Sequence, residues 1–192
     1  MEKLFDYKNE NGVISVITPY DAEFVNKARN LRGKWKDGAW HFDDSIEDYV
    51  KQALKDCYGT TGEDPVETCS LVIKNFDDST DCGPVTLFGR TIAKAWGRDS
   101  GAKLGDNIIW ISGKYFSGGS VKNWRTGVVN AYFEIQNFPV PRTKFEDVQK
   151  AIEGGWCEIK MPKRKRTPEQ IQADIEKYEA ILAELRNELN NL

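Results

Sequence analysis

The stretch VISVITPYDAEFVNKARNLRGKWKDGAWHF, residues 13–42, changes its pattern three times and so decides the N-terminal fold. Its first five residues are mostly β-branched and follow Asn11-Gly12, which is typical of a strand. Pro19 ends that strand, and Asp21 can cap a helix whose apolar residues recur at helical spacing. Asp37-Gly38 then supplies the two-residue turn of a hairpin.

These elements are predicted to belong to one module over residues 1–59. Gly33 is predicted to end the first helix, because glycine is common at helix C-termini. A second amphipathic helix is predicted from Ser45, ending before Gly59. The expected order is therefore strand, helix, hairpin, helix.

A turn-rich linker, residues 60–65, leads to a second predicted module over residues 66–159. It has one predicted helix, residues 144–153, and five predicted strands: residues 69–74, 85–88, 108–112, 128–135 and 156–159. With so few helices between strands, a mostly antiparallel β module is expected, and the fold class is α+β.

The C-terminal residues 167–192 carry the clearest periodicity. Apolar side chains alternate in steps of four and three: Ile171, Ile175, Tyr178, Leu182, Leu185, Leu189 and Leu192. This is the seam of a coiled-coil helix, and it predicts self-association. The alternative is that the helix folds back onto its own domains.

The amino-acid composition excludes several kinds of catalytic and metal site. The chain has 192 residues, a net charge of −3 and a single histidine, so histidine-based triads and two-histidine metal sites are excluded. The four cysteines show no CxxC spacing, and no cofactor is expected. No apolar run is long enough to cross a membrane and no signal pattern opens the chain, which predicts a cytoplasmic protein.

A dense basic linker, residues 160–166, interrupts the mildly acidic chain. Its cations include Lys163, Arg164, Lys165 and Arg166, and it contains no acid. Such a cluster attracts phosphate groups. The alternative is a solvated linker that keeps two modules apart.

Two further segments are candidate phosphate or nucleotide sites. In residues 113–125 the candidates are Gly118, Gly119, Ser120, Lys122, Trp124 and Arg125, where loop amides and cations would hold phosphate and tryptophan would stack. The alternative is a polar hairpin tip.

In residues 90–101 the candidates are Arg90, Lys94, Trp96 and Arg98, whose cations share one face in either a helix or a strand. The alternative is that these cations pair with acids such as Asp99 and Asp106.

Catalytic candidates are few. Asp77, Asp78 and Asp81 beside Cys82 are the residues that a metal-dependent nuclease would use, but an acidic loop explains them better. Trp35, Trp40 and Phe42 are predicted to pack in the core. We therefore expect a non-enzymatic protein.

The N-terminal residues 13–59 resemble HARP-like domains. The resemblance rests on Thr18-Pro19-Tyr20-Asp21, Gly33-Lys34-Trp35 and Gly38-Ala39-Trp40-His41-Phe42. HARP-like domains accompany annealing helicases and occur in phage and plasmid proteins, where the best-known members help to engage branched or single-stranded DNA. The resemblance implies a nucleic-acid context and covers about the first third of the chain.

These observations predict an oligomeric phage- or plasmid-type accessory protein that binds nucleic acid or a nucleotide. The alternative is a viral counter-defence protein that blocks a host defence complex or sequesters a nucleotide immune signal. For a phage protein, the location would be the host cytoplasm.

Overall fold

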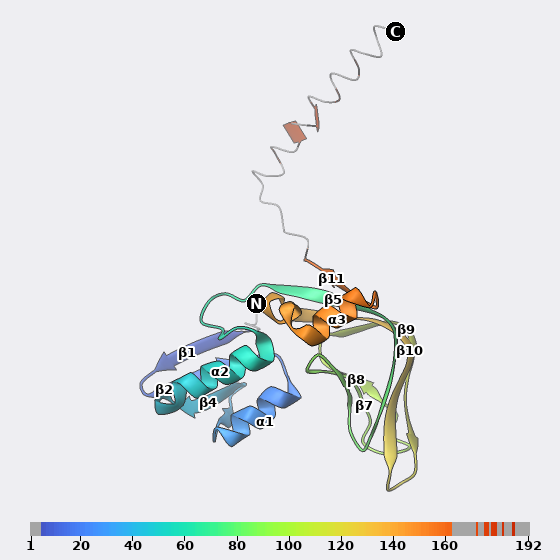
Figure 1. Ribbon diagram of the computed structural model, residues 1–192, viewed down its shortest axis with the longest axis horizontal. Coiled ribbons are helices and arrows are strands. Elements are labelled where there is room, and N and C mark those ends of the chain that lie inside the picture. The colour runs from blue at the N-terminus through green and yellow to red at the C-terminus, as the bar shows by residue number, and fades with distance from the viewer. Residues whose placement is uncertain are drawn as a thin grey trace. The chain divides into compact units, whose positions relative to one another are not determined.

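The computed structural model describes residues 5–162 and, beyond them, Gln172, Ile175, Glu176, Tyr178, Glu179, Leu182 and Arg186. Over these residues the chain is an α+β protein with antiparallel sheets (Figure 1). One compact unit ends at Met161, and a C-terminal unit begins at Pro162. The first unit contains two hydrophobic cores, one in an N-terminal lobe (residues 5–59) and one in a second lobe (residues 66–161).

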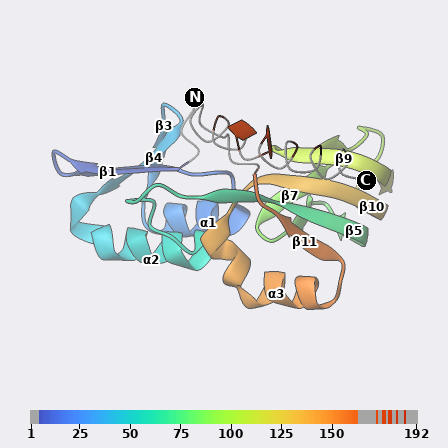
Figure 2. The same cartoon turned by 90° about the horizontal axis from the view of Figure 1, so that it is seen from above.

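The N-terminal lobe is a four-stranded sheet with two helices on one side (Figure 2). Its strand order is β1-β2-β4-β3. The elements are β1 (Asp6–Glu10), β2 (Val13–Ile17), α1 (Ala22–Asn30), β3 (Lys34–Lys36), β4 (Ala39–Asp43), the 3-10 turn η1 (Asp44–Ile46) and α2 (Glu47–Tyr58). Phe24, Val50 and Leu54 are almost fully buried between the helices and the sheet.

The structure confirms the predicted helix cap and the predicted hairpin turn of this lobe. The Asp21 carboxylate accepts a hydrogen bond from the Phe24 amide at 2.9 Å and caps α1, and Asp37 and Gly38 form the hairpin turn with φ of 50° and 78°. The prediction that Gly33 ends α1 is wrong, because Arg32 takes the left-handed conformation, with φ of 60°. Gly33 is needed for another reason: a Cβ there would overlap the Phe42 ring.

The second lobe confirms the antiparallel arrangement, but β5, β9 and β10 are longer than predicted, and β7 and β8 were not predicted. Its sheets have the orders β11-β5-β10-β9 and β6-β7-β8. The elements are β5 (Thr68–Asp81), β6 (Val85–Leu87), β7 (Arg90–Lys94), β8 (Lys103–Leu104), β9 (Ile108–Gly119), β10 (Trp124–Pro139), the 3-10 turn η2 (Val140–Lys144), α3 (Glu146–Glu153) and β11 (Cys157–Lys160). Figure 1 shows β7 and β8 between the long strands and the N-terminal lobe.

The two lobes meet where the β6–β7 turn reaches the start of α1. A Cβ at Gly89, which has a φ of 80°, would overlap the Asp21 carboxylate. The next residue, Arg90, is buried, and its guanidinium donates a hydrogen bond to the Asn137 carbonyl at 2.7 Å. This close approach places the end of β2 and the small sheet side by side.

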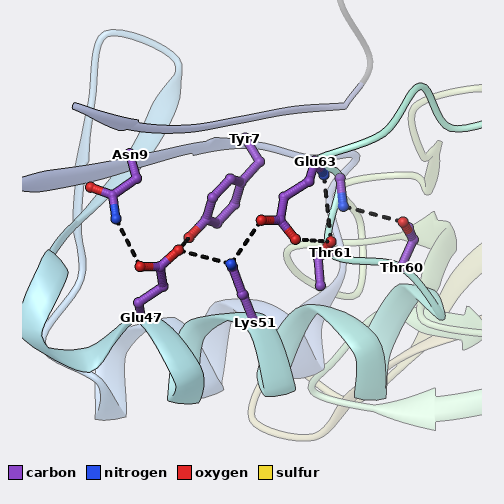
Figure 3. Close-up of polar contacts among 8 residues, drawn as sticks. Tyr7, Asn9, Glu47, Lys51, Thr60, Thr61 and Glu63 are labelled. Carbon is purple, nitrogen blue, oxygen red and sulfur yellow. Dashed lines mark hydrogen bonds and ion pairs between the residues drawn. The ribbon is translucent and has the colours of Figure 1, made fainter.

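A network of paired charges fastens the linker to the N-terminal lobe (Figure 3). The Lys51 ammonium lies 2.8 Å from Glu47 Oε1 and 2.7 Å from Glu63 Oε1. The Tyr7 hydroxyl donates to Glu47 at 2.8 Å, and the Thr61 hydroxyl donates to Glu63 at 2.9 Å. We call these five residues the paired cluster, and they join β1, α2 and the linker.

The seven described C-terminal residues are helical. Among them Ile175, Tyr178 and Leu182 are exposed, and the Gln172 amide donates to Glu176 at 3.1 Å, one helical turn away. The other predicted seam residues, Ile171, Leu185, Leu189 and Leu192, and the cations Lys163, Arg164, Lys165 and Arg166 lie outside the described residues. In the part of the chain that the structure describes, the helices lack the length and apolar character needed to cross a membrane.

Candidate nucleic-acid interface

Two lysines face each other across the small sheet without a carboxylate between them. Lys94 on β7 is the direct register partner of Lys103 on β8. Like charges directly opposite each other on an antiparallel pair are destabilising. Within the described ranges, neither lysine forms a hydrogen bond or an ion pair with another side chain. Their charges are therefore available to an anionic ligand.

The ring of Trp96 lies beside both ammonium groups. Lys94 Nζ is 5.5 Å from the centroid of this ring and Lys103 Nζ is 5.9 Å from it. Trp96 itself is 59% exposed. A cation near an aromatic face is attracted by the ring quadrupole, so the ring holds the two ammonium groups close together.

The backbone of Trp96 is fixed on both sides. The preceding amide, of Ala95, donates to the buried hydroxyl of Thr126 at 3.0 Å, and that hydroxyl donates to the Gly83 carbonyl at 2.7 Å. The Trp96 amide donates to Ser100 Oγ at 3.0 Å. Thr126 and Ser100 are therefore positioning residues that keep the exposed ring in place.

Two adjoining pockets surround this constellation. The lysine pocket, of about 260 Å³, is lined by Tyr20, Pro84, Arg90, Thr91, Lys94, Trp96, Lys103, Leu104, Gly105 and Asp106. The lobe pocket, of about 520 Å³, is lined by Thr18, Pro19, Tyr20, Asp21, Phe24, Val25, Arg29, Trp35, Trp40, Tyr58 and Asp106. They share Tyr20 and Asp106, so they adjoin, and we call the two pockets together the groove.

Exposed aromatic rings are concentrated in this groove. Over residues 5–162, the four most exposed are Tyr20, Trp35, Trp96 and Tyr49, and the first three of these line the groove. Trp35 was predicted to pack in the core, and it is 57% exposed because β3 is the edge strand of its sheet. Trp40 and Phe42 are buried as predicted.

Two buried charged residues, Asp21 and Arg90, line the groove from different lobes. Burial raises the pKa of Asp21, and hydrogen bonds from the Phe24 and Glu23 amides partly offset that rise. Burial lowers the pKa of Arg90, which the nearby Tyr58 and Asp21 counteract. Arg90 is only 4% exposed, so its guanidinium is committed to the protein interior.

The predicted stripe of Arg90, Lys94 and Arg98 does not form. Arg90 and Lys94 lie on the strand β7, but this strand ends at Lys94 and does not extend to Arg98. Arg98 follows in a turn, where its guanidinium binds the Asp99 carboxylate with distances of 2.7 to 2.9 Å. The sequence reasoning identified Lys94 and Trp96, and it missed Lys103, Tyr20 and Trp35.

Residues 113–125 form the outer part of the β9–β10 hairpin. Gly118 pairs with Arg125, and Gly119 pairs with Trp124. At the tip, the Ser120 amide donates to the Asn123 carbonyl, so it is already satisfied. Arg125 lies 2.7 Å from Asp81, and Lys122 is exposed. The polar hairpin tip is the alternative that this geometry favours.

The acidic residues and cysteines singled out as catalytic candidates do not form a metal site within the described ranges. No group of three or more potential metal ligands is found there. Asp77 accepts a hydrogen bond from the Asn130 amide, and Asp78 accepts one from the Ser79 amide. Burial raises the pKa of the Cys69 and Cys157 thiols to about 11, which disfavours the reactive thiolate.

Comparison of the chain with protein-family models, with curated proteins and with solved structures gave no match. The resemblance to HARP-like domains stays a prediction.

Proposed function

We propose that the protein binds single-stranded nucleic acid in the groove, without catalysing a reaction on it. The observation that carries this proposal is the opposed pair Lys94 and Lys103 beside the exposed ring of Trp96. Repulsion between the two lysines destabilises the free protein. A backbone phosphate bound between the ammonium groups would neutralise this repulsion.

A single strand fits this groove better than a duplex does. Single-strand sites combine cations that follow the backbone with aromatic rings on which successive bases stack. Tyr20, Trp35 and Trp96 offer such rings, and stacking on them requires bases that are not already stacked in a duplex. The cations at the two ends are Arg29 in the lobe pocket and the two lysines in the lysine pocket.

The C-terminal helix supports this function by self-association. Ile175, Tyr178 and Leu182 are helical and exposed in the single chain, with the spacing of a coiled-coil seam. Joining several weak sites raises the apparent affinity through effective concentration. Native mass spectrometry of the full chain should show an oligomer, and Leu182→Lys should shift it toward the monomer. A monomeric full chain would contradict this part of the proposal.

The binding itself is tested by fluorescence anisotropy with labelled single-stranded DNA and RNA and with duplex DNA of equal length. Single strands should bind more tightly than the duplex, and their affinity should fall as salt rises. The slope of log K against log salt is about 0.7 for each phosphate contact in single strands. Lys94→Ala with Lys103→Ala should therefore reduce its magnitude by about 0.7, because both lysines contact the same phosphate.

The matched control neutralises two cations on the hairpin outside the groove, Lys114→Ala with Lys122→Ala. Both lysines are exposed, so this control removes the same charge and leaves the groove intact. Its slope should stay close to that of the unmodified protein. Equal slopes for the two double variants would contradict the proposed site.

A further inference from the structure

The lobe pocket has the size and lining of a binding site. Its volume of about 520 Å³ lies within the usual range of small-molecule sites. Five aromatic side chains line it: Tyr20, Phe24, Trp35, Trp40 and Tyr58. Such walls accept a flat, weakly polar ring more readily than a charged phosphate.

Trp35 provides a stacking wall that is already held in position. Its ring contacts the buried ring of Trp40 edge to face, with centroids 5.5 Å apart and an interplanar angle of 63°. The two residues are direct partners in the β3–β4 hairpin. Because this contact leaves the Trp35 ring more than half exposed, the ring offers surface on which a base can stack.

Asp106 stands at the boundary between the lobe pocket and the lysine pocket. It lies between Gly105, whose amide donates to the Ile92 carbonyl at 3.0 Å, and Asn107, which has a φ of 60°. Within residues 5–162 its carboxylate has no hydrogen-bond or ion-pair partner. A carboxylate there repels phosphate, and it can only accept hydrogen bonds.

A nucleobase is the ligand part that satisfies both features. Its flat faces suit the aromatic walls, and its exocyclic amino group is a donor for an acceptor-only side chain. Adenine and cytosine carry such amino groups, as does guanine, whereas thymine and uracil present carbonyl oxygens at the equivalent positions. At those positions an oxygen would face the Asp106 carboxylate without a proton between them. The one donor that thymine and uracil keep on this edge, the ring N3–H, lies between two carbonyl oxygens that repel a carboxylate.

We infer that the lobe pocket receives one base of the bound strand, with Trp35 stacking on it and Asp106 selecting bases that carry an exocyclic amino group. This inference rests on the proposed function, since the lysine pocket would hold the neighbouring phosphate. Asp106 would thus give a preference among bases to a groove whose other contacts, with phosphate and with base faces, do not distinguish them.

The test compares oligo-dA, oligo-dC and oligo-dT of equal length by anisotropy. The unmodified protein should bind oligo-dA and oligo-dC about tenfold more tightly than oligo-dT. Asp106→Asn should reduce this ratio and strengthen binding of oligo-dT, because asparagine can donate a hydrogen bond to thymine. Trp35→Ala should weaken binding of all three, while the dependence on Lys94 and Lys103 remains.

Asp64→Asn is the matched control, because Asp64 is an exposed acid of the linker and the charge change is the same. It should leave the base preference unchanged. Equal binding of the three oligonucleotides that still depends on Lys94 and Lys103 would overturn the inference and leave the proposed function standing. Absence of binding to all three would overturn the proposed function, and the inference with it.

Discussion

The paired cluster on the N-terminal lobe and the lysine pair on the small sheet treat positive charge in opposite ways. In the paired cluster, the single cation of Lys51 lies between Glu47 and Glu63 (Figure 3). On the small sheet, Lys94 and Lys103 are register partners beside the ring of Trp96, and neither forms an ion pair within the described residues. The first arrangement stabilises the fold, while the second leaves charge for a ligand to neutralise.

The difference shows how structural and functional charges can be told apart. A satisfied ion pair gains little from an added anion, because its cation already has its partners. An opposed pair of cations becomes more stable when an anion binds, and binding free energy includes that relief. Functional sites commonly contain locally destabilising arrangements, and stabilising interactions elsewhere in the fold compensate for them.

The largest effect is expected from Gly89→Ala, which breaks the junction between the two lobes that line the groove. A Cβ at Gly89 would overlap the Asp21 carboxylate, and the φ of 80° is strained for alanine. The free energy of unfolding should fall by about 3 kcal/mol. Oligonucleotide binding should fall with it, because the Asp21 neighbour Tyr20 lines both pockets.

The control for this variant is Gly155→Ala. Gly155 also has a positive φ, of 74°, but a Cβ there would meet no atom within 4 Å. Chemical denaturation should show a cost of about 1 kcal/mol for this variant, from backbone strain alone. Equal costs for the two variants would show that the approach of Gly89 to Asp21 does not hold the lobes together.

Lys103→Glu should make the lysine pair resemble the paired cluster. The new carboxylate would lie directly opposite Lys94, and an opposite-charge pair in this position contributes about 0.2–1 kcal/mol. The melting temperature should therefore rise, while affinity for a single strand falls about tenfold. Lys122→Glu, with the same charge change at the hairpin tip, should leave the affinity nearly unchanged. A lower melting temperature for Lys103→Glu would contradict the idea that the pair is strained.

The smallest effect is expected from Lys51→Met, which removes the cation of the paired cluster. Hydrogen bonds from Lys51 are the main cause of the lowered pKa values of Glu47 and Glu63. Stability from lowered carboxylate pKa values is fully present above the ordinary value of 4.5 and is lost as pH falls through the lowered values. The variant should melt at a slightly lower temperature near neutral pH, and the difference should shrink on acidification.

Melting curves measured from about pH 6 down to about pH 3 check this dependence. Lys55→Met on the same helix is the control, because Lys55 is an exposed lysine with no ion pair in the described residues. Oligonucleotide affinity should be unaffected by either variant. A loss of affinity in Lys51→Met would show that the paired cluster also serves binding.

The local elements of the fold could be predicted from sequence because their causes are local. Asp37-Gly38 determines a tight hairpin, and Asp21 satisfies an amide at the start of α1. The strand β1 was missed, because Asp6–Glu10 is polar and gives no apolar alternation. Its pairing with β2 is set by the Asn11-Gly12 turn, which has φ of 54° and 79°. The Asn-Gly dipeptide itself was a usable sequence signal for this hairpin.

The candidate site was only partly predictable, because its residues come together through packing between the lobes. Lys94 and Trp96 are neighbours in the sequence, so their proximity could be foreseen. Lys103 joins them through a strand of two residues, too short to show a pattern. Tyr20 lines both pockets next to Asp21, which Gly89 approaches, and Trp35 lines the lobe pocket from the edge strand β3. Sequence periodicity predicts neither position.

The most direct test of the groove is single-strand affinity after Trp96→Ala, compared with Tyr49→Ala. Both rings are more than half exposed, at 59% and 68%, but Tyr49 lines neither pocket of the groove. Loss of a stacked base costs about 1–3 kcal/mol, so Trp96→Ala should weaken binding about tenfold or more while the melting temperature stays nearly constant. Tyr49→Ala should bind like the unmodified protein. Equal affinities for the two variants would contradict the assignment of the groove as the binding site.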